Sequence, residues 1–143
     1  MKLQVQTVDT NYVVQVWPLI EGYLNDALTK DNDAPDWSEC YNIHHVQAFL
    51  TGGIWLLLVA VDEENKIHGA ATVSFSNYPM SRVAFITLIG GRLVSNKDTF
   101  DQLKMILKQR GATKVQGYGR ESIVRLWKRY GFEPRTTLVE VKL

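Results

Sequence analysis

The sequence has one cysteine, no long hydrophobic run and almost no net charge. Cys40 is the only cysteine among 143 residues, which excludes a disulfide within the chain and favours a reducing, cytoplasmic location. The longest apolar run, Ile54–Val61, is far shorter than the roughly 18 residues of a membrane helix. The first ten residues lack the apolar core of a signal peptide. The net charge of +1 argues against a dedicated nucleic-acid-binding domain, which is usually strongly basic.

Acidic residues are missing from the middle of the chain. No Asp or Glu occurs between Lys66 and Asn96, so this stretch supplies no carboxylate to act as a general base. His44 and His45 are adjacent and diverge by about 100° on a helix, with no carboxylate four residues from either. A G-x-S-x-G motif is also absent. The sequence therefore predicts neither a metal site nor Ser-His-Asp catalysis.

The composition is that of one globular domain. A length of 143 residues, with 45% hydrophobic and 22% charged residues, fits a single domain spanning 1–143. The spacing of apolar residues changes along the chain between the period of strands and that of helices. Strands are predicted at Leu3–Thr7, Ile54–Val61, Ile67–Phe75, Arg82–Ile89, Lys114–Gln116 and Thr136–Leu143. Helices are predicted from Val13, from Asp36 to Gly52, over Phe100–Arg110 and over Arg120–Tyr130.

Local signals refine these boundaries. Pro18 interrupts the first helix, which predicts a kink or two short helices. Asp36 and Glu39 have the spacing of a capping box and are expected to open the second helix. Gly131 and Phe132 have the residue types of a left-handed helix end and its apolar partner.

The order of elements is therefore β-α-α-β-β-β-α-β-α-β. Three consecutive strands indicate an antiparallel meander, and the later strand–helix–strand passage adds a parallel neighbour. The predicted fold class is α/β (α+β), with a mixed, mostly antiparallel sheet and helices on both faces.

This order, and the segment RLWKRYGFEP (Arg125–Pro134), resemble the GNAT acetyltransferase superfamily over the whole chain. In that family a helix ending in Gly-Phe precedes the last strand. A narrower resemblance, to small GNAT-like proteins of tailed bacteriophages, rests on AFLTGGIWLLLVA (Ala48–Ala60), LIGGR (Leu88–Arg92) and GYGRESIVRLWKRYGF (Gly117–Phe132).

The family resemblance implies acetyl-CoA as cofactor, bound in a V-shaped gap between the fourth and fifth strands. The pantetheine would pair with the strand edge at Leu88, Ile89 and Gly90. The pyrophosphate would sit on backbone amides at Ser95–Phe100, at the start of the next helix.

The family's small-residue pattern is missing at that pyrophosphate turn. Ser95, Asp98 and Phe100 occupy its places, so an ordinary helix start capped by Ser95 and Asp98 is the alternative interpretation. Arg92 and Lys97 could bind phosphate from the side. Arg120, after the short G-x-G of residues 117–119, could add to an anion site.

The resemblance also implies an acid that protonates the departing thiolate, at the place where this sequence has Trp127. An indole is no practical proton donor, so Tyr130 and Tyr118 are the candidate acids, although Trp127 and Tyr130 could simply be core residues. His68 has a suitable intrinsic pKa for a general base; the alternative is an ordinary surface histidine.

Two functions remain open. The first is a GNAT-type transfer of acetyl from acetyl-CoA to an amine of a small molecule or peptide. The second is a catalytically silent GNAT fold that binds protein assembly partners, in the host cytoplasm or in a phage virion. The basic last helix, with Arg125, Lys128 and Arg129, suggests nucleic acid only weakly, because a solvated helix face explains it equally.

Overall fold

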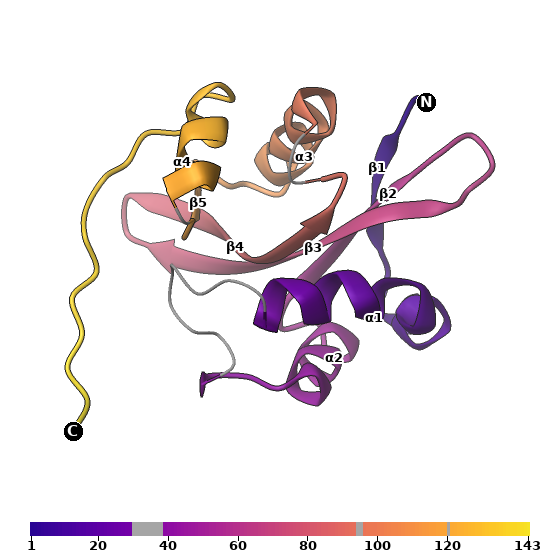
Figure 1. Cartoon of the computed structure of the whole chain (residues 1–143), viewed down its shortest axis with the longest axis horizontal. Coiled ribbons are helices and arrows are strands. Elements are labelled where there is room, and N and C mark those ends of the chain that lie inside the picture. The colour runs from indigo at the N-terminus through magenta and orange to yellow at the C-terminus, as the bar shows by residue number, and fades with distance from the viewer. Residues whose placement is uncertain (30–38, 94–95, 120) are drawn as a thin grey trace.

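The computed structural model (Figure 1) describes residues 1–29, 39–93, 96–119 and 121–143. The order of strands and helices along the chain follows the order predicted from the apolar spacing, except at the C-terminus. In chain order the elements are β1 (Gln4–Val8), the 3-10 helix η1 (Thr10–Tyr12), α1 (Val13–Thr29), α2 (Ile43–Thr51), β2 (Leu56–Val61), β3 (Ile67–Tyr78), β4 (Ser81–Gly91), α3 (Lys97–Gln109), β5 (Lys114–Gly117) and α4 (Glu121–Lys128).

The five strands form one mixed sheet in the order β1-β2-β3-β4-β5. The β2–β3 and β3–β4 pairings are antiparallel, which confirms the predicted meander. Strand β1 adds antiparallel to β2, and β5 lies parallel to β4. The parallel pairing is possible because α3 carries the chain back across the sheet before β5 begins.

Helices cover both faces of this sheet, as predicted. Figure 1 shows α1 and α2 on one face and α3 and α4 on the other. Trp17, Leu24 and Leu50 pack under the first pair of helices. Phe100 and Trp127 belong to the core under the second pair. The two faces are buried by separate apolar clusters, and the sheet separates them.

Two helix boundaries differ from the prediction. Residue 18 lies inside a single helix α1, so the predicted alternative of two short helices does not occur. The amide that Pro18 lacks deprives only the carbonyl of Val14, on an exposed part of the helix. Helix α2 begins at Ile43 and not at residue 36, which lies outside the described residues. The helix begins there because Asn42 and His45 cap it reciprocally: His45 N–H donates to Asn42 Oδ1 (3.0 Å), and Asn42 N–H donates to His45 Nδ1 (3.1 Å).

The end of α4 confirms the Gly-Phe prediction. Gly131 has a φ of 97°, which glycine adopts without a steric penalty. Phe132 N–H donates to the Trp127 carbonyl (3.1 Å), and Gly131 N–H donates to the Lys128 carbonyl (3.2 Å). These two bonds make the Schellman arrangement that the sequence indicates.

The predicted last strand is wrong for this chain. Residues 133–143, called the C-terminal segment below, pair with no described strand. The alternating pattern of Thr136–Leu143 is present, but a strand forms only where a neighbour offers its backbone. The segment instead runs past the sheet from the α4 side toward the α2 side (Figure 1). Among the described residues, no helix is long and apolar enough to cross a membrane.

Candidate active site at the end of β4

The candidate site lies where β4 and β5 stop pairing. Ile86 is paired with Gly117, which is the last residue of β5. Strand β4 continues for five further residues to Gly91, still paired with β3. Within the part of the chain that the structure describes, no strand pairs with the other edge of β4 over those residues.

A β-bulge marks the same point on β4. The β3–β4 register steps from Thr72 opposite Leu88 to Val73 opposite Ile86, which leaves Thr87 as an extra residue. A bulge bends its strand and increases the local twist. Strand β4 is therefore bent where its pairing with β5 ends.

Two buried threonines satisfy the polar groups that the bulge disturbs. Leu88 N–H donates to Thr72 Oγ1 (3.1 Å), and the two hydroxyl oxygens of Thr72 and Thr87 lie 2.6 Å apart. Thr87 Oγ1 donates in turn to the Thr72 carbonyl (3.0 Å). The protons can be assigned without conflict, since Thr72 accepts from Leu88 and donates to Thr87. This closed network fixes the shape of the strand edge.

The bulge also decides which backbone amide of β4 reaches the open edge. Leu88 N–H is turned toward β3 by its bond to Thr72, and Arg92 N–H is turned the same way by its bond to the His68 carbonyl (2.9 Å). Successive residues of a strand direct their amides to opposite edges. Of the three predicted edge residues, Leu88 and Gly90 therefore face β3, and Ile89 presents its amide to the open edge.

The start of α3 differs from the predicted anion turn. Its N-cap is Asn96, whose side chain accepts from Thr99 N–H (3.2 Å). The predicted cap Ser95 lies outside the described residues, and the Asp98 carboxylate accepts from Gln102 Nε2 (3.0 Å). Asp98 in the first turn places negative charge where a phosphate would bind.

Phe100 does not block this turn, because its ring is fully buried in the core. It packs against Trp127, Tyr130 and Phe132, with ring centroids 5.3, 5.0 and 5.7 Å apart.

Trp127 lies beside the end of β5. A Cβ added to Gly117 would come within 3.3 Å of the far edge of the indole ring. The side chain is 5% exposed, and its buried indole N–H finds no hydrogen-bond partner among the described residues. A side chain at position 117 would therefore crowd the indole where α4 packs against the point of strand divergence.

The two candidate tyrosines occupy different environments. Tyr130 is buried against Phe100, and its carbonyl accepts from Lys104 Nζ (2.8 Å). Tyr118 follows Gly117 directly and is 43% exposed. Its ring packs edge-on against Phe85, with centroids 5.1 Å apart. Tyr118 is therefore the tyrosine next to the strand divergence with access to solvent.

His68 is not brought to the tyrosines. Its neighbour Gly69 pairs with Gly91, whereas Gly117 pairs with Ile86, and these two β4 positions are separated by about 16 Å along a strand. His68 Nε2 instead donates to Asp62 Oδ2 (2.8 Å). This bond, with those from the amides of Lys66 and Glu64, holds the pKa of the Asp62 carboxyl below its ordinary value of 3.8.

Of the basic residues predicted to bind phosphate, Lys97 already forms an ion pair within the chain. Lys97 Nζ donates to Asp101 Oδ2 (2.8 Å), and this bond raises the pKa of the Lys97 ammonium. Arg92 is exposed and lies just past the end of β4. Arg120 falls outside the described residues. No group of three metal-ligating side chains is found in the described ranges.

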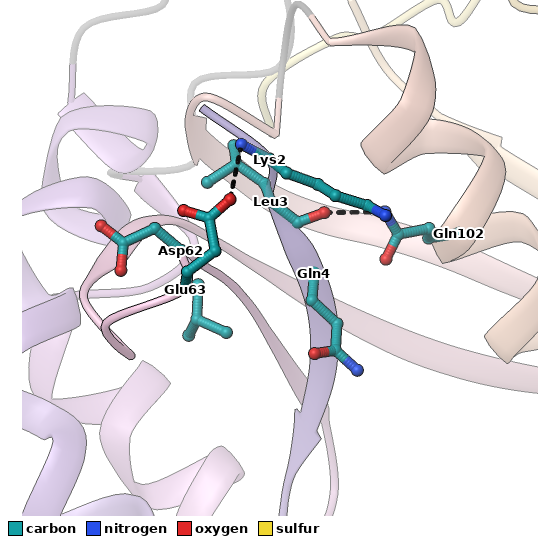
Figure 2. A pocket seen from close by; sticks show the side chains of 7 residues that line it. Lys2, Leu3, Gln4, Asp62, Glu63 and Gln102 are labelled. Carbon is teal, nitrogen blue, oxygen red and sulfur yellow. Dashed lines mark hydrogen bonds between the residues drawn. The ribbon is translucent and has the colours of Figure 1, made fainter.

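A cavity of about 440 Å³ lies at the opposite edge of the sheet. Figure 2 shows that its lining comes from the start of β1, the turn after β2, and α3. Several of its polar groups are already bonded: Glu63 accepts from Lys2 N–H (3.3 Å), and Gln102 donates to the Leu3 carbonyl (2.9 Å). We therefore place the candidate site at the strand divergence and not in this cavity, because the divergence offers a free backbone edge.

The structural role of Thr72 and Thr87 at the bulge is not predicted by the sequence. Two threonines in two apolar strands look like ordinary β-branched residues. Only the pairing register shows that one is a bulge residue and that the other bonds across to it.

Solved structures of other proteins share the fold of this chain. No family model and no curated protein matches the chain, but solved structures do. A protein described as a predicted acetyltransferase from Clostridium acetobutylicum, crystallised with acetyl-CoA, matches with a TM-score of 0.63 and 18% identity over 99% of this chain and 96% of the other. An aminoglycoside acetyltransferase from an uncultured soil metagenomic sample, in complex with sisomicin, gives a TM-score of 0.68 and 16% identity over 99% and 96%.

A GNAT family acetyltransferase from Staphylococcus aureus matches with a TM-score of 0.64 and 14% identity over the full length of both chains. At these identities the likeness concerns the fold. The chain has the GNAT fold, in a divergent form, and the resemblance to phage proteins stays a prediction.

Proposed function

We propose that the chain transfers an acetyl group from acetyl-CoA to a primary amine. The observation that carries the proposal is the bulged end of β4, where pairing with β5 stops and the amide of Ile89 is left on an open edge. Structures with the same fold include one that contains acetyl-CoA and others that are aminoglycoside acetyltransferases.

The residues present fit the pantetheine part of acetyl-CoA better than its phosphates. An edge amide at Ile89 can bond an amide carbonyl of an extended chain, as one strand bonds another. The α3 start is less suited, because Asp98 repels phosphate and Asn96 already holds the Thr99 amide. Exposed Arg92 would supply the countercharge.

Acetyl-CoA supplies a thioester whose acyl carbon accepts the amine. In the overall change a C–N bond forms, the C–S bond breaks, the amine loses a proton and the sulfur gains one. The chain contributes mainly by holding the reactants in place. We assign the proton donated to sulfur to the Tyr118 hydroxyl, because Tyr118 is exposed beside the last residue of β5.

A thermal shift with acetyl-CoA and with CoA tests binding. Ligand at a hundred times its dissociation constant stabilises the fold by about 2.7 kcal/mol, which is about 9 °C for a chain of this length. Ile89→Pro removes the edge amide at a position where no strand bond is lost, and Ile89→Val is the matched control that keeps it. The shift should disappear in the first variant and persist in the second. No shift in the wild-type protein would refute the proposal.

Release of free thiol, followed with a panel of aminoglycosides, polyamines and lysine peptides, tests transfer. Tyr118→Phe should lower kcat by roughly 10²-fold, in the range of general acid catalysis, while the thermal shift with acetyl-CoA stays unchanged. Tyr130→Phe is the control, and because Tyr130 is buried its hydroxyl should matter little for kcat. Equal losses in both variants would exclude the role given to Tyr118.

The start of α3 favours a second candidate function. A GNAT fold that has lost acetyl-CoA binding could serve as a binding or assembly protein, in a phage particle or elsewhere, and Asp98 at the phosphate position suits that loss. Isolation from the native source would then yield the chain within a larger complex and without a response to acetyl-CoA. A free chain that binds acetyl-CoA would exclude this candidate.

A further inference from the structure

The hairpin of β3 and β4 extends beyond the strands on either side of it. Strand β2 pairs with β3 only as far as Val73, and β5 pairs with β4 only from Val83. The turn between β3 and β4 lies at one end of the sheet (Figure 1) and carries two exposed apolar side chains, Tyr78 at 61% and Met80 at 96%. Single exposed apolar residues are common on protein surfaces, so the surroundings of this turn decide whether it has a role.

Four cations lie at the same end of the sheet. Arg82 Nε donates to the carbonyl of Arg110, the C-cap of α3 (3.1 Å), and Thr113 N–H donates to the Arg82 carbonyl (2.8 Å) just before Lys114. Lys108 lies in the last turn of α3. The side chains of Lys108, Arg110 and Lys114 are exposed. The start of β4, the end of α3 and the start of β5 therefore bring four positive charges together.

No described carboxylate pairs with these cations. The sequence has no Asp or Glu from Ile67 to Asn96 or from Gln102 to Arg120, although the whole chain has a net charge of only +1. Arg82 Nη1 donates to Asn77 Oδ1 (2.7 Å), and its guanidinium stacks 4.2 Å above the centre of the Phe75 ring. A planar guanidinium that is already held in place can bind a phosphate with its remaining N–H groups at little further loss of entropy. This end of the molecule is thus locally basic and has a fixed phosphate donor.

The surface at this end of the sheet, called the hairpin surface below, consists of Tyr78, Met80, Arg82, Lys108, Arg110 and Lys114. We propose that the hairpin surface docks on a membrane that contains anionic phospholipids. The cations bind the lipid phosphates, and the two apolar side chains enter the boundary between headgroups and acyl chains. Both parts are needed, because one shallow anchor alone gives only marginal, reversible binding. Nucleic acid fits less well, because its phosphate surface offers no apolar layer to Met80.

Docking in this way leaves the candidate active site accessible. Val83 is the β4 residue paired with Lys114, and Ile89 lies six residues further along the same strand, or about 20 Å away. The open edge at Ile89 is therefore remote from the docked end. Membrane docking does not depend on the proposed acetyl transfer, and each can be tested without the other.

Co-sedimentation with lipid vesicles tests the proposal. The wild-type chain should bind vesicles that mix phosphatidylcholine with phosphatidylglycerol but not vesicles of phosphatidylcholine alone, and added salt should release it. Each cation near an anionic membrane strengthens binding by about fivefold. The triple variant Lys108→Gln, Arg110→Gln and Lys114→Gln should therefore bind the mixed vesicles about 100-fold more weakly.

The matched control removes the same charge from another surface. Arg125→Gln, Lys128→Gln and Arg129→Gln together neutralise the exposed face of α4 and should lose little binding. Because all six side chains are exposed, both triple variants should keep the circular dichroism of the wild type. Equal losses of binding in the two variants would overturn the proposal, since net charge alone would then explain the attraction.

The apolar contribution has its own pair of variants. Met80→Ser should weaken binding to the mixed vesicles by about tenfold, whereas Met105→Ser, at an exposed methionine of α3, should not change it. A wild-type chain that does not bind the mixed vesicles at low salt would overturn the proposal. Tighter binding to a single-stranded DNA oligonucleotide at the same salt concentration, unaffected by Met80→Ser, would also overturn it and would assign the hairpin surface to nucleic acid.

Discussion

Replacing Thr87 by valine should destabilise the fold by removing a buried hydroxyl that both accepts from Thr72 and donates to it. Valine has nearly the shape of threonine, so packing changes little and the lost hydroxyl is the perturbation. Thr87 Oγ1 accepts from Thr72 across 2.6 Å and donates to the Thr72 carbonyl across 3.0 Å. Without it, the Thr72 hydroxyl keeps Leu88 as a donor but loses its acceptor.

The magnitude follows from burial. Thr72 is fully buried, so no water replaces the lost partner. A buried polar group left unsatisfied costs about 1–3 kcal/mol. We expect a loss near 2 kcal/mol for Thr87→Val, or about 7 °C in Tm for a chain of this length.

Urea unfolding followed by circular dichroism measures this loss, and Thr87→Ser is the matched control. Serine keeps the hydroxyl and should recover most of the stability. Thr72→Val should cost as much as Thr87→Val or more, because it leaves the buried Leu88 amide without an acceptor. The double variant should cost less than the sum of the two, since both changes break the same bond.

Two outcomes would refute this reasoning. One is a Thr87→Val protein within about 0.5 kcal/mol of wild type, the range of an ordinary surface substitution. The other is a Thr87→Ser protein as unstable as Thr87→Val, which would assign the loss to packing. A strictly additive double variant would show that the two hydroxyls do not share a bond.

The remaining predictions concern charge and close packing. Because bonding lowers the pKa of Asp62 below 3.8, its ionised form stabilises the fold fully above that pH and less as pH falls through the lowered value. The Tm difference between wild type and Asp62→Asn should therefore be largest near neutral pH and vanish in acid; a constant difference would contradict it. Gly90→Ala would place a methyl 2.7 Å from the Tyr23 carbonyl oxygen and should cost about 1–3 kcal/mol. Gly22→Ala, with open space around it in α1, should be stabilising, and equal effects of the two substitutions on Tm would contradict the close approach.

Signals confined to a few neighbouring residues were predictable from the sequence. The left-handed Gly131 and the two bonds after α4 follow from residue types at fixed spacing. The meander could also be predicted from the sequence, because its strands are consecutive and the turns between them are short. The start of α2 was missed because His45, and not a glutamate, completes the cap of Asn42.

Features that depend on distant partners were not predictable. The pattern of Thr136–Leu143 is that of a strand, yet a strand also requires a free edge, and the sequence does not say which edge is free. The bulge at Thr87 depends on its register with Thr72, fifteen positions earlier. The separation of His68 from Tyr118 likewise appears only when strands are aligned.

The bond between Gln102 and β1 has a consequence for the order in which this protein forms during synthesis. The amide of Val5 is held by a side chain 97 positions further along the chain. Strand β1 also lies beside β2, whose last residue is Val61. A ribosome would therefore release β1 long before either partner exists: β1 can pair with β2 only after Val61 has emerged, and its outer edge stays uncovered until α3 has emerged. The beginning of the chain is among the last parts of the sheet to be secured.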